Sequence, residues 1–270
     1  MHPSDQEWKK FNEGFFRLAK LDLNQYKADQ MRRRILGMIE AKGLGNLDSF
    51  LKWLNQSSEN VNWFQDKMAI NVSELFRNPE KWEELAGKIL PELLQGKSAL
   101  KCWSAGCSYG AEAHTLASIF ASKFKGKHQI IGTDIDQAAL AQAKSGLFAE
   151  SDMRNVPDTI KASYFSKSGD QWQASQEIRN YCTFKTANLL ESPLETGFDL
   201  IMCRNVVIYF TEDAKNQLYQ RFMDALRPGG YLFVGSTERI FRHKEIGFET
   251  PVPFFYQKPI QEGNRWRNAS

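Results

Sequence analysis

Three polar or reactive residues interrupt an apolar stretch in the last third of the chain. Residues 198–210 read FDLIMCRNVVIYF, with Cys203-Arg204-Asn205 in the middle. Apolar runs of this length usually form buried strands, where an arginine is rarely found without a partner. We therefore expect a strand that ends at this tripeptide and displays Arg204 and Asn205 at the edge of a sheet, where a polar ligand can bind them. The alternative is a structural salt bridge between Arg204 and an acid such as Glu238.

A glycine turn and a strand-end acid indicate a nucleotide-like ligand. Residues 103–110 read WSAGCSYG, a loosened glycine loop that includes Ala105 and Gly106 and lets the backbone approach a ligand. Residues 130–134 read IIGTD, so Asp134 ends the next strand, roughly where a ribose-binding acid follows the first βαβ unit. Either feature alone has a plainer explanation, because many α/β proteins have a glycine turn for steric reasons and Asp134 can cap a helix. Together, in this order, they favour an adenosine site.

The glycine loop also limits what the adenosine can carry. It lacks the full G-x-G-x-x-G pattern and the Lys-Ser/Thr of a P-loop. This disfavours a pyrophosphate-bearing ligand, and S-adenosylmethionine fits what remains. A nicotinamide-dependent oxidoreductase, the rival from another enzyme class, predicts a fuller glycine pattern and a proton-relay residue, and neither is evident.

The elements that must position these residues alternate between strands and helices after about residue 97. Strands are expected at 100–104, 129–133, 198–203 and 231–234, with helices at 112–124 and 212–226. This alternation predicts an α/β, Rossmann-like domain with a parallel, doubly wound sheet over residues 97–270. Residues 164–186 break the rhythm with short alternating segments around Ser168-Gly169-Asp170, which predicts a small antiparallel β insertion at about 163–186.

The first 70 residues differ from the rest of the chain in the spacing of their apolar residues, which predicts an all-α domain. Apolar residues recur at helical spacing there, and residues 71–96 form a linker segment to the α/β domain. The helical domain carries one basic cluster, consisting of Lys27, Arg32, Arg33 and Arg34. A solvated helix face is the default explanation for such a cluster, and a docking surface for an acidic partner is the alternative.

Composition excludes several classes of function. The formal net charge of +3 is too small to indicate nucleic-acid binding, and no stretch approaches the length of a membrane span or a signal peptide's apolar core. The four cysteines form no CxxC pair, and the four histidines lack metal-ligand spacing. We expect a cytoplasmic protein with buried free thiols and no metal site.

The motifs in this order resemble the CheR family of chemotaxis protein methyltransferases. The resemblance rests on NVSELFR at 71–77, SAGCS at 104–108 through Glu112, TDI at 133–135, NL at 188–189, CRNVVIYF at 203–210 and LRPGG at 226–230. The CRN-x-x-IYF string is the most specific of these. The resemblance implies methyl transfer from S-adenosylmethionine to glutamate side chains in the cytoplasmic domain of transmembrane chemoreceptors, giving glutamate methyl esters and S-adenosylhomocysteine. It also implies a helical domain followed by a Rossmann-like domain with a small β insertion, and neither nucleic-acid binding nor membrane insertion.

Site roles follow from the resemblance by position. The residues that would contact the cofactor are Asn71, Ser73, Arg77, Ala105, Gly106, Glu112, Asp134, Asn188, Leu189, Arg204 and Asn205. Glu112 and Asp134 would hold the charged amino group or the ribose. Arg77 and Tyr209 would face the transferring methyl as catalytic residues, although a surface ion pair and ordinary core packing are their plainer explanations. The usual loop S-T-G-E-E-P-Y reads SYGAEAH at 108–114, so Tyr109, Ala111 and His114 depart from the family pattern.

The chemistry of such a reaction agrees with the residues present. A glutamate acceptor is already ionised at neutral pH, so no general base is required. No His-Asp or Cys-His pairing is recognisable in the sequence, which is consistent with this requirement. Two alternatives stay open: an S-adenosylmethionine-binding receptor adaptor without catalysis, and a methyltransferase with a different acceptor.

Overall fold

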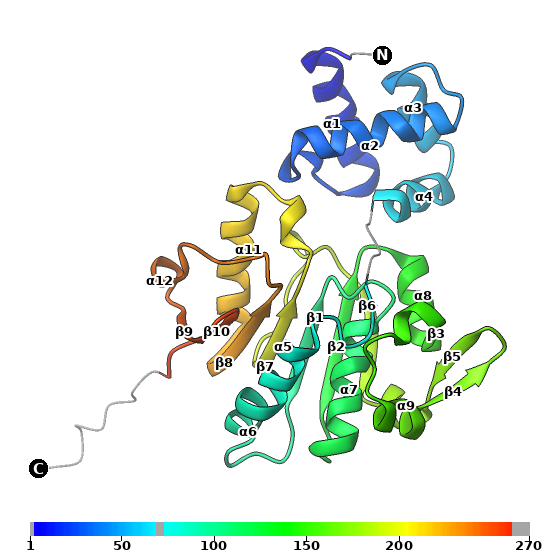
Figure 1. Cartoon of the computed structure of the whole chain (residues 1–270). Helices are drawn as coiled ribbons and strands as arrows, with labels where there is room; N and C mark the ends of the chain where they lie inside the picture. The colour runs from blue at the N-terminus through cyan, green and yellow to red at the C-terminus, as the bar shows by residue number, and fades with distance from the viewer. Residues whose placement is uncertain (1–2, 69–72, 261–270) are drawn as a thin grey trace, which may run out of the picture.

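The computed structural model describes residues 3–68 and 73–260, which fold into a helical unit and an α/β unit (Figure 1). The helical unit contains α1 (Asp5–Ala19), α2 (Ala28–Ala41), α3 (Leu47–Leu54) and α4 (Ser58–Met68). Ser4 and Glu7 form a capping box that starts α1, and the Asn46 side chain caps α3. The helices bury a core that is rich in phenylalanine, including Phe15, Phe50 and Phe64. None of the helices in the described residues is long and apolar enough to cross a membrane.

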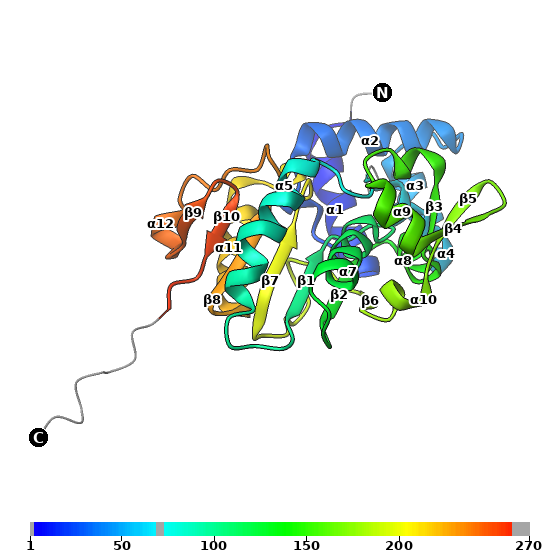
Figure 2. The ribbon, with the colours of Figure 1, turned by 60° about the horizontal axis from the view of Figure 1, so that its bottom comes forward.

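The α/β unit is built on one mixed sheet with the strand order β6-β2-β1-β7-β8-β10-β9 (Figure 2). Its parallel strands are β1 (Lys101–Ala105), β2 (Gln129–Asp134), β6 (Cys182–Thr186), β7 (Phe198–Cys203) and β8 (Leu226–Val234). Two antiparallel strands, β9 (Glu249–Val252) and β10 (Phe255–Gln257), extend the β8 edge. The predicted α/β class with a largely parallel sheet is confirmed.

Helices cover both faces of this sheet. The longest are α7 (Ala111–Lys123) on one face and α11 (Glu212–Ala225) on the other, and α8 (Gln137–Ser145) and the short α12 (His243–Ile246) lie near the edges. Side chains of β7 alternate between the two apolar clusters, with Leu200 and Met202 on the α7 side and Ile201 and Cys203 on the α11 side. Strand β7 is therefore buried on both faces, as a parallel-sheet strand requires.

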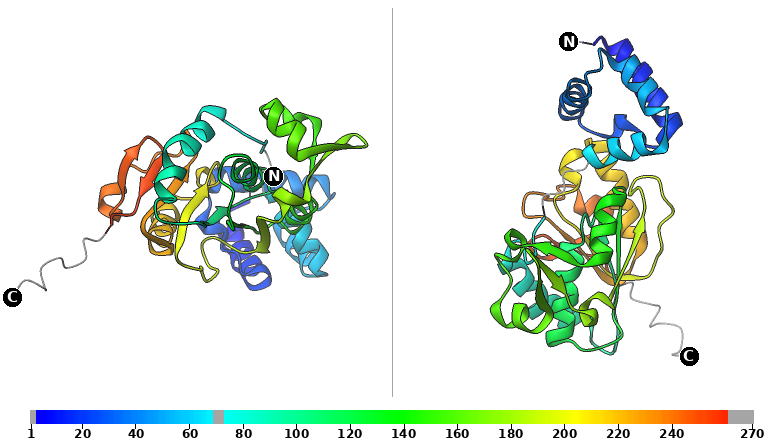
Figure 3. Two further views of the ribbon diagram at one scale, coloured as in Figure 1. Left: turned by 90° about the horizontal axis from the view of Figure 1, so that it is seen from below. Right: turned by 90° about the vertical axis from the view of Figure 1, so that its right-hand side faces the viewer.

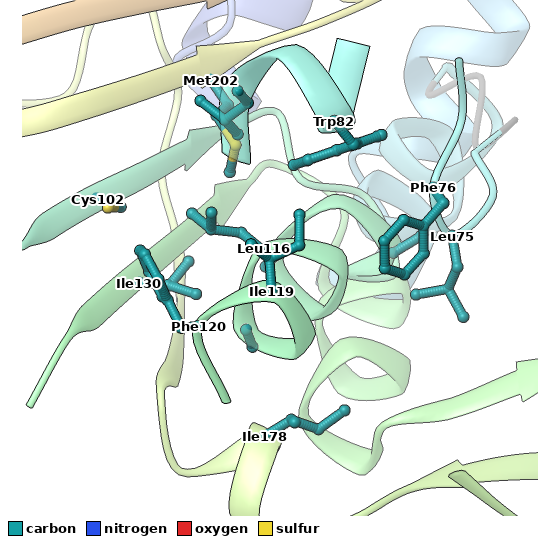
Figure 4. Packing of buried hydrophobic residues seen from close by; sticks show 14 of the residues in the cluster. Leu75, Phe76, Trp82, Cys102, Leu116, Ile119, Phe120, Ile130, Ile178 and Met202 are labelled. Atoms are coloured by element: carbon teal, nitrogen blue, oxygen red, sulfur yellow. The ribbon is translucent and has the colours of Figure 1, made fainter. Parts of the chain in front are cut away.

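A helical segment between the two units packs on the sheet rather than acting as a plain linker. It consists of α5 (Pro79–Glu84), a π-helical turn (Leu85–Ile89) and α6 (Leu90–Leu93). Figure 4 shows Trp82 of this segment in the apolar cluster that also holds Leu116 and Met202. Pro79 lies at the start of the segment, where its missing N–H is not needed, and Pro91 lies two residues after the π-helical turn, where the regular helical hydrogen-bond pattern is already interrupted.

The small antiparallel sheet differs from its prediction. It has the order β3-β5-β4, with β3 (Leu147–Ala149), β4 (Phe165–Ser168) and β5 (Gln171–Ala174). The short helices α9 (Asp158–Tyr164) and α10 (Gln176–Arg179) flank β4 and β5. The predicted range of 163–186 is wrong at both ends, because β3 belongs to the insertion and Cys182–Thr186 is β6 of the main sheet. Only Phe184 of residues 182–186 is buried, so the burial pattern alone does not reveal a parallel edge strand.

The helical unit sits at the end of the α/β unit, as Figure 3 shows from two sides. The backbone N–H of Lys27 donates to Tyr209 O at 3.0 Å, and that of Thr211 donates to Gln25 O at 2.9 Å. Between these bonds the rings of Tyr26 and Phe210 meet edge to face, with their centroids 5.1 Å apart. The start of α2 is thereby fixed to the chain that follows β7.

Candidate functional site

A cavity of about 500 Å³ lies where β1, β2 and β7 end, below the helical unit. This volume is in the range of small-molecule sites, about 300–1,000 Å³. Both units line the cavity, and nine of the predicted site residues are among the lining: Ser73, Arg77, Gly106, Glu112, Asp134, Asn188, Leu189, Arg204 and Asn205. Tyr209 lines it as well. Sheet edges of this kind gather ligand-binding residues because all parallel strands end on the same side.

Two predicted residues do not enter this set. Ala105 is fully buried and belongs to the apolar cluster on the α11 side of the sheet, so it supports the turn from below. Asn71 lies outside the described residues.

The glycine turn after β1 bends back over the end of β2. The N–H groups of Gly106 and Cys107 both donate to Thr133 O, at 2.8 and 2.9 Å. Gly106 has φ +72, and a Cβ at this position would lie 2.6 Å from Val206 Cγ2. Any larger residue would therefore strain the turn and collide with the loop that follows β7.

Asp134 is held by the same turn. Its carboxylate accepts the N–H of Ser108 at 2.8 Å and the N–H of Asp136 at 3.0 Å. Burial raises the pKa of Asp134, and these backbone donors lower it. A carboxylate has about four acceptor positions, so the side chain can still accept hydrogen bonds from ligand hydroxyl groups.

Glu112 and Arg204 form the buried charge pair of the site. Ser104 Oγ donates to Glu112 Oε1 at 2.8 Å, and Arg204 Nη1 lies 3.7 Å from Glu112 Oε2. Burial raises the pKa of Glu112, whereas the Arg204 guanidinium lowers it. Only 4% of the Arg204 side chain is exposed. The acid beside Arg204 is therefore Glu112, a cavity-lining residue.

Glu238, the predicted alternative partner of Arg204, binds backbone N–H groups instead. Its carboxylate accepts the N–H groups of Asn205 at 2.5 Å, Val207 at 3.0 Å and Gly235 at 2.9 Å. Asn205 adopts a left-handed conformation with φ +62. Glu238 thus shapes the loop after β7 and fixes how Asn205 is presented, and no ion pair joins it to Arg204 among the described residues.

Arg204 also organises the segment that carries Arg77. Its Nη2 donates to Arg77 O and to Asn78 Oδ1, both at 3.0 Å. Its guanidinium carbon lies 5.3 Å from the ring centroid of Trp82 and 4.7 Å from that of Phe233. Nothing in the sequence indicated these two aromatic partners, because they come from distant segments.

Positive charges gather near Tyr209 at the other side of the cavity. Burial raises the pKa of the Tyr209 hydroxyl, and the nearby charges of Arg34 and Arg77 lower it. Lys27, Arg33 and Arg34 line the cavity. The fourth residue of the predicted cluster, Arg32, points elsewhere: its Nη2 pairs with Asp5 Oδ1 at 2.9 Å and its guanidinium lies over Trp8.

The helical unit adds lining residues that the sequence did not reveal: Leu21, Tyr26, Gln30, Met31 and Met68. Burial and the charge of Asp134 raise the pKa of Tyr26, and both residues line the cavity. A tyrosine between two helices gives no sequence signal for such a role.

Comparison with known proteins identifies the family. The family model described as CheR methyltransferase, SAM binding domain, matches residues 71–251, and the CheR methyltransferase all-alpha domain matches residues 6–68. This chain belongs to the CheR methyltransferase family. It is 39% identical over 240 residues to the chemotaxis protein methyltransferase of Listeria innocua, covering 88% of this chain and 92% of that one. The corresponding Borreliella burgdorferi protein is 30% identical over 249 residues, covering 87% of this chain and 88% of that one. Among solved structures, a glycopeptide N-methyltransferase complexed with sinefungin aligns at 11% identity with a TM-score of 0.39, covering 60% of this chain and 50% of that chain.

The S-adenosylmethionine-binding domain of this CheR family member has groups that fit the cofactor. The cavity contains carboxylates, suited to hydroxyl and ammonium groups, and guanidinium groups, suited to a carboxylate. In addition, Asn188 Nδ2 and Arg204 Nε are shielded from solvent and have no hydrogen-bond partner among the described residues. Buried donors of this kind are costly unless a ligand accepts from them.

The departures from the CheR loop pattern at Tyr109, Ala111 and His114 each have a structural explanation or contact. Ala111 is fully buried, where a carboxylate would be costly. His114 is also fully buried, and its Nδ1 donates to Gly110 O at 2.8 Å. Tyr109 reaches out of the loop and contacts Ser73 O and Asp152.

Proposed function

We propose that this protein transfers the methyl group of S-adenosylmethionine to glutamate carboxylates of methyl-accepting chemotaxis receptors. The products are glutamate methyl esters and S-adenosylhomocysteine, and the reaction serves chemotaxis adaptation in the cytoplasm. The observation that carries the proposal is a cavity with acids on one wall, Glu112 and Asp134, and Arg34 and Arg77 beside Tyr209. The acids suit a cationic cofactor, and the arginines suit an anionic acceptor.

Binding of the cofactor is assigned to residues that the fold already holds in place. Asp134 would accept hydrogen bonds from the ribose hydroxyls, and Glu112, beside the Arg204 guanidinium, would hold the ammonium group. Asn188 and Arg204 offer their unpartnered N–H groups. Gly106 allows the close backbone approach, and Ser73, Leu189 and Asn205 complete the wall.

The acceptor is oriented by Arg77 and Tyr209. When bound, the cofactor supplies an electrophilic methyl group on a sulfonium that becomes a neutral thioether. Arg77 attracts the incoming carboxylate, and Tyr209, still protonated at neutral pH, orients it with its hydroxyl. Neither residue needs to move a proton, because the acceptor arrives ionised. Arg77 must bind the carboxylate loosely, since a tight pair would stabilise the reactants more than the transition state.

The helical unit excludes water from this reaction. Tyr26 and Met31 of the helical unit line the cavity together with Gly106 of the glycine turn. Attack of an anion on a cation cancels charge, so a drier cavity favours the transition state over the separated ions. Fixing α2 to the loop after β7 therefore contributes to the rate as well as to the shape of the site.

The partner surface is the basic side of α2. Lys27 and Arg33 are exposed and Arg34 is half-buried, and all three line the mouth of the cavity. They suit an acidic helix of a chemoreceptor that carries the target glutamate. Arg32 belongs to the same sequence cluster but is paired with Asp5 on the α1 side.

The test is methyl transfer from labelled S-adenosylmethionine to membranes that contain chemoreceptors, followed by alkali treatment. We expect alkali-labile label on the receptor, and at least a tenfold lower rate for Arg77→Ala and Tyr209→Phe. Arg33→Ala should raise the KM for receptor, whereas Arg32→Ala, on the same helix, should not. Alkali-stable label would refute a carboxylate acceptor. Full receptor function in both Arg77→Ala and Tyr209→Phe would favour an adaptor without catalysis.

A further inference from the structure

The segment Ser73–Arg77 carries two proposed site residues without regular secondary structure. It runs between α4 and α5, and Phe76 within it has φ +54. A backbone of this kind needs hydrogen bonds from other elements to stay in one conformation. The contacts that hold it therefore decide where Arg77 lies.

Tyr109 of the glycine turn makes one of these contacts at the start of the segment. Its hydroxyl donates to Ser73 O and lies 3.1 Å from Asp152 Oδ1. The ring is 8% exposed and packs near Phe148, with centroids 6.3 Å apart. Burial and the neighbouring Asp152 raise the pKa of Tyr109, so the hydroxyl remains a donor.

At the end of the segment, Arg77 O accepts from Arg204 Nη2 and Trp82 Nε1, both at 3.0 Å. The middle of the segment is held by the same part of the α/β unit as Ser73. The N–H of Leu75 donates to Asp152 O at 3.2 Å, and that of Phe76 donates to Thr115 Oγ1 at 2.9 Å. Figure 4 shows Leu75 and Phe76 in the cluster with Leu116 and Ile119 of α7. Asp152 itself lies in the turn Glu150–Met153 that follows β3 of the insertion. The segment is thus fastened from α7, from the insertion and, through Tyr109, from the cofactor turn.

We propose that Tyr109 is a positioning residue for methyl transfer, which ties the glycine turn to Ser73–Arg77 and so holds Arg77 in the cavity. The proposal rests on the proposed function in one respect, the role of Arg77. Threonine, the usual residue at this loop position, is too short for the same contact, so the tie belongs to this chain's own loop sequence.

The test compares Tyr109→Phe with Tyr231→Phe. Tyr231 is a matched control because it is 1% exposed and its hydroxyl donates to Glu92 Oε2 at 2.9 Å, away from the cavity. We expect Tyr109→Phe to lower kcat about three- to tenfold, the effect of losing one hydrogen bond, whereas Tyr231→Phe keeps the wild-type kcat. The amides of Leu75 and Phe76 should exchange faster with solvent in Tyr109→Phe only.

A second comparison separates positioning from general loosening. In an Arg77→Ala background, Tyr109→Phe should lower kcat less than twofold, because the residue that it positions is gone. Two results would overturn the proposal. One is an unchanged kcat in Tyr109→Phe, and the other is the same three- to tenfold decrease in kcat when Tyr109→Phe is added to Arg77→Ala. If the wild-type protein methylates no receptor, the proposed function fails, and the amide exchange together with the affinity for S-adenosylhomocysteine still decides the role of Tyr109.

Discussion

Acidification should destabilise this protein through one buried histidine. His114 lies on α7 between the rings of Phe148 and Phe184, with centroid distances of 5.2 and 5.7 Å. Its Nδ1 donates to Gly110 O, and its Nε2 has no partner among the described residues. Burial lowers the pKa of His114 from 6.5 to about 4. The folded protein therefore keeps this imidazole neutral where the unfolded chain would protonate it.

The change in the free energy of unfolding with pH follows from the difference between the folded and unfolded pKa values of His114. A histidine with a depressed pKa contributes stability that is present above pH 6.5 and is lost as the pH falls toward 4. Between pH 7 and pH 5 the unfolded imidazole gains about 0.7 of a proton, whereas the folded one gains about 0.1. The free energy of unfolding should fall by about 2 kcal/mol over this interval from His114 alone.

The assay is urea unfolding of the wild-type protein and of His114→Phe at pH 5, 7 and 8. Phenylalanine keeps the ring contacts but cannot be protonated. The difference between the two proteins at pH 8 reports the change in packing and the lost hydrogen bond to Gly110 O, and its change between pH 8 and pH 5 reports the titration. Parallel pH profiles for the two proteins would refute the buried, neutral state of His114.

Two further predictions concern the cofactor turn and the contact between the units. Gly106→Ala should weaken binding of S-adenosylhomocysteine at least tenfold by calorimetry, because its Cβ meets a valine side chain at 2.6 Å; Gly169→Ala, with a similar φ of +59 and nothing within 4 Å, should bind normally. On α4, burial and a hydrogen bond to Asp136 raise the pKa of Asp66 to about 6, so the stability from this pair is present at low pH and is lost as the pH rises through 6. Asp66→Asn should remove that loss and be more stable than the wild type at pH 7 by about 1 kcal/mol after solvent screening, measured by thermal unfolding; equal stability at pH 7 would contradict it.

The sequence predicted which residues would line the cavity wherever a residue stands at the end of a strand. Asp134 ends β2, and Arg204 with Asn205 follows β7, so their positions follow from the apolar runs before them. Because parallel strands end at the same edge of a sheet, residues 70 positions apart can be placed in one cavity from local patterns alone. The glycine turn could be placed in the same way, because it directly follows strand β1.

Contacts between residues that are far apart in the sequence could not be predicted from local patterns. The pairing of Arg204 with Glu112 rather than Glu238 depends on how α7 lies against β7, which no local pattern specifies. The same is true of Tyr26, which reaches the cavity only because α2 starts against the loop after β7. The short alternating segments of residues 164–186 predict that Cys182–Thr186 belongs to the insertion, whereas the parallel pairing of β6 with β2 is a non-local property that no local pattern reveals.

Arg204 shows why an arginine occupies this place in an otherwise apolar run. A buried ion pair contributes little net stability compared with apolar side chains of similar volume. The guanidinium nevertheless fixes two distant parts of the site relative to one another, because its planar fork reaches Arg77 O on one side and faces Glu112 on the other. The acid proposed for the cofactor ammonium and the segment proposed to bring Arg77 to the acceptor are thus set by one rigid group. Its cost in desolvation is consistent with a role in geometry rather than in stability.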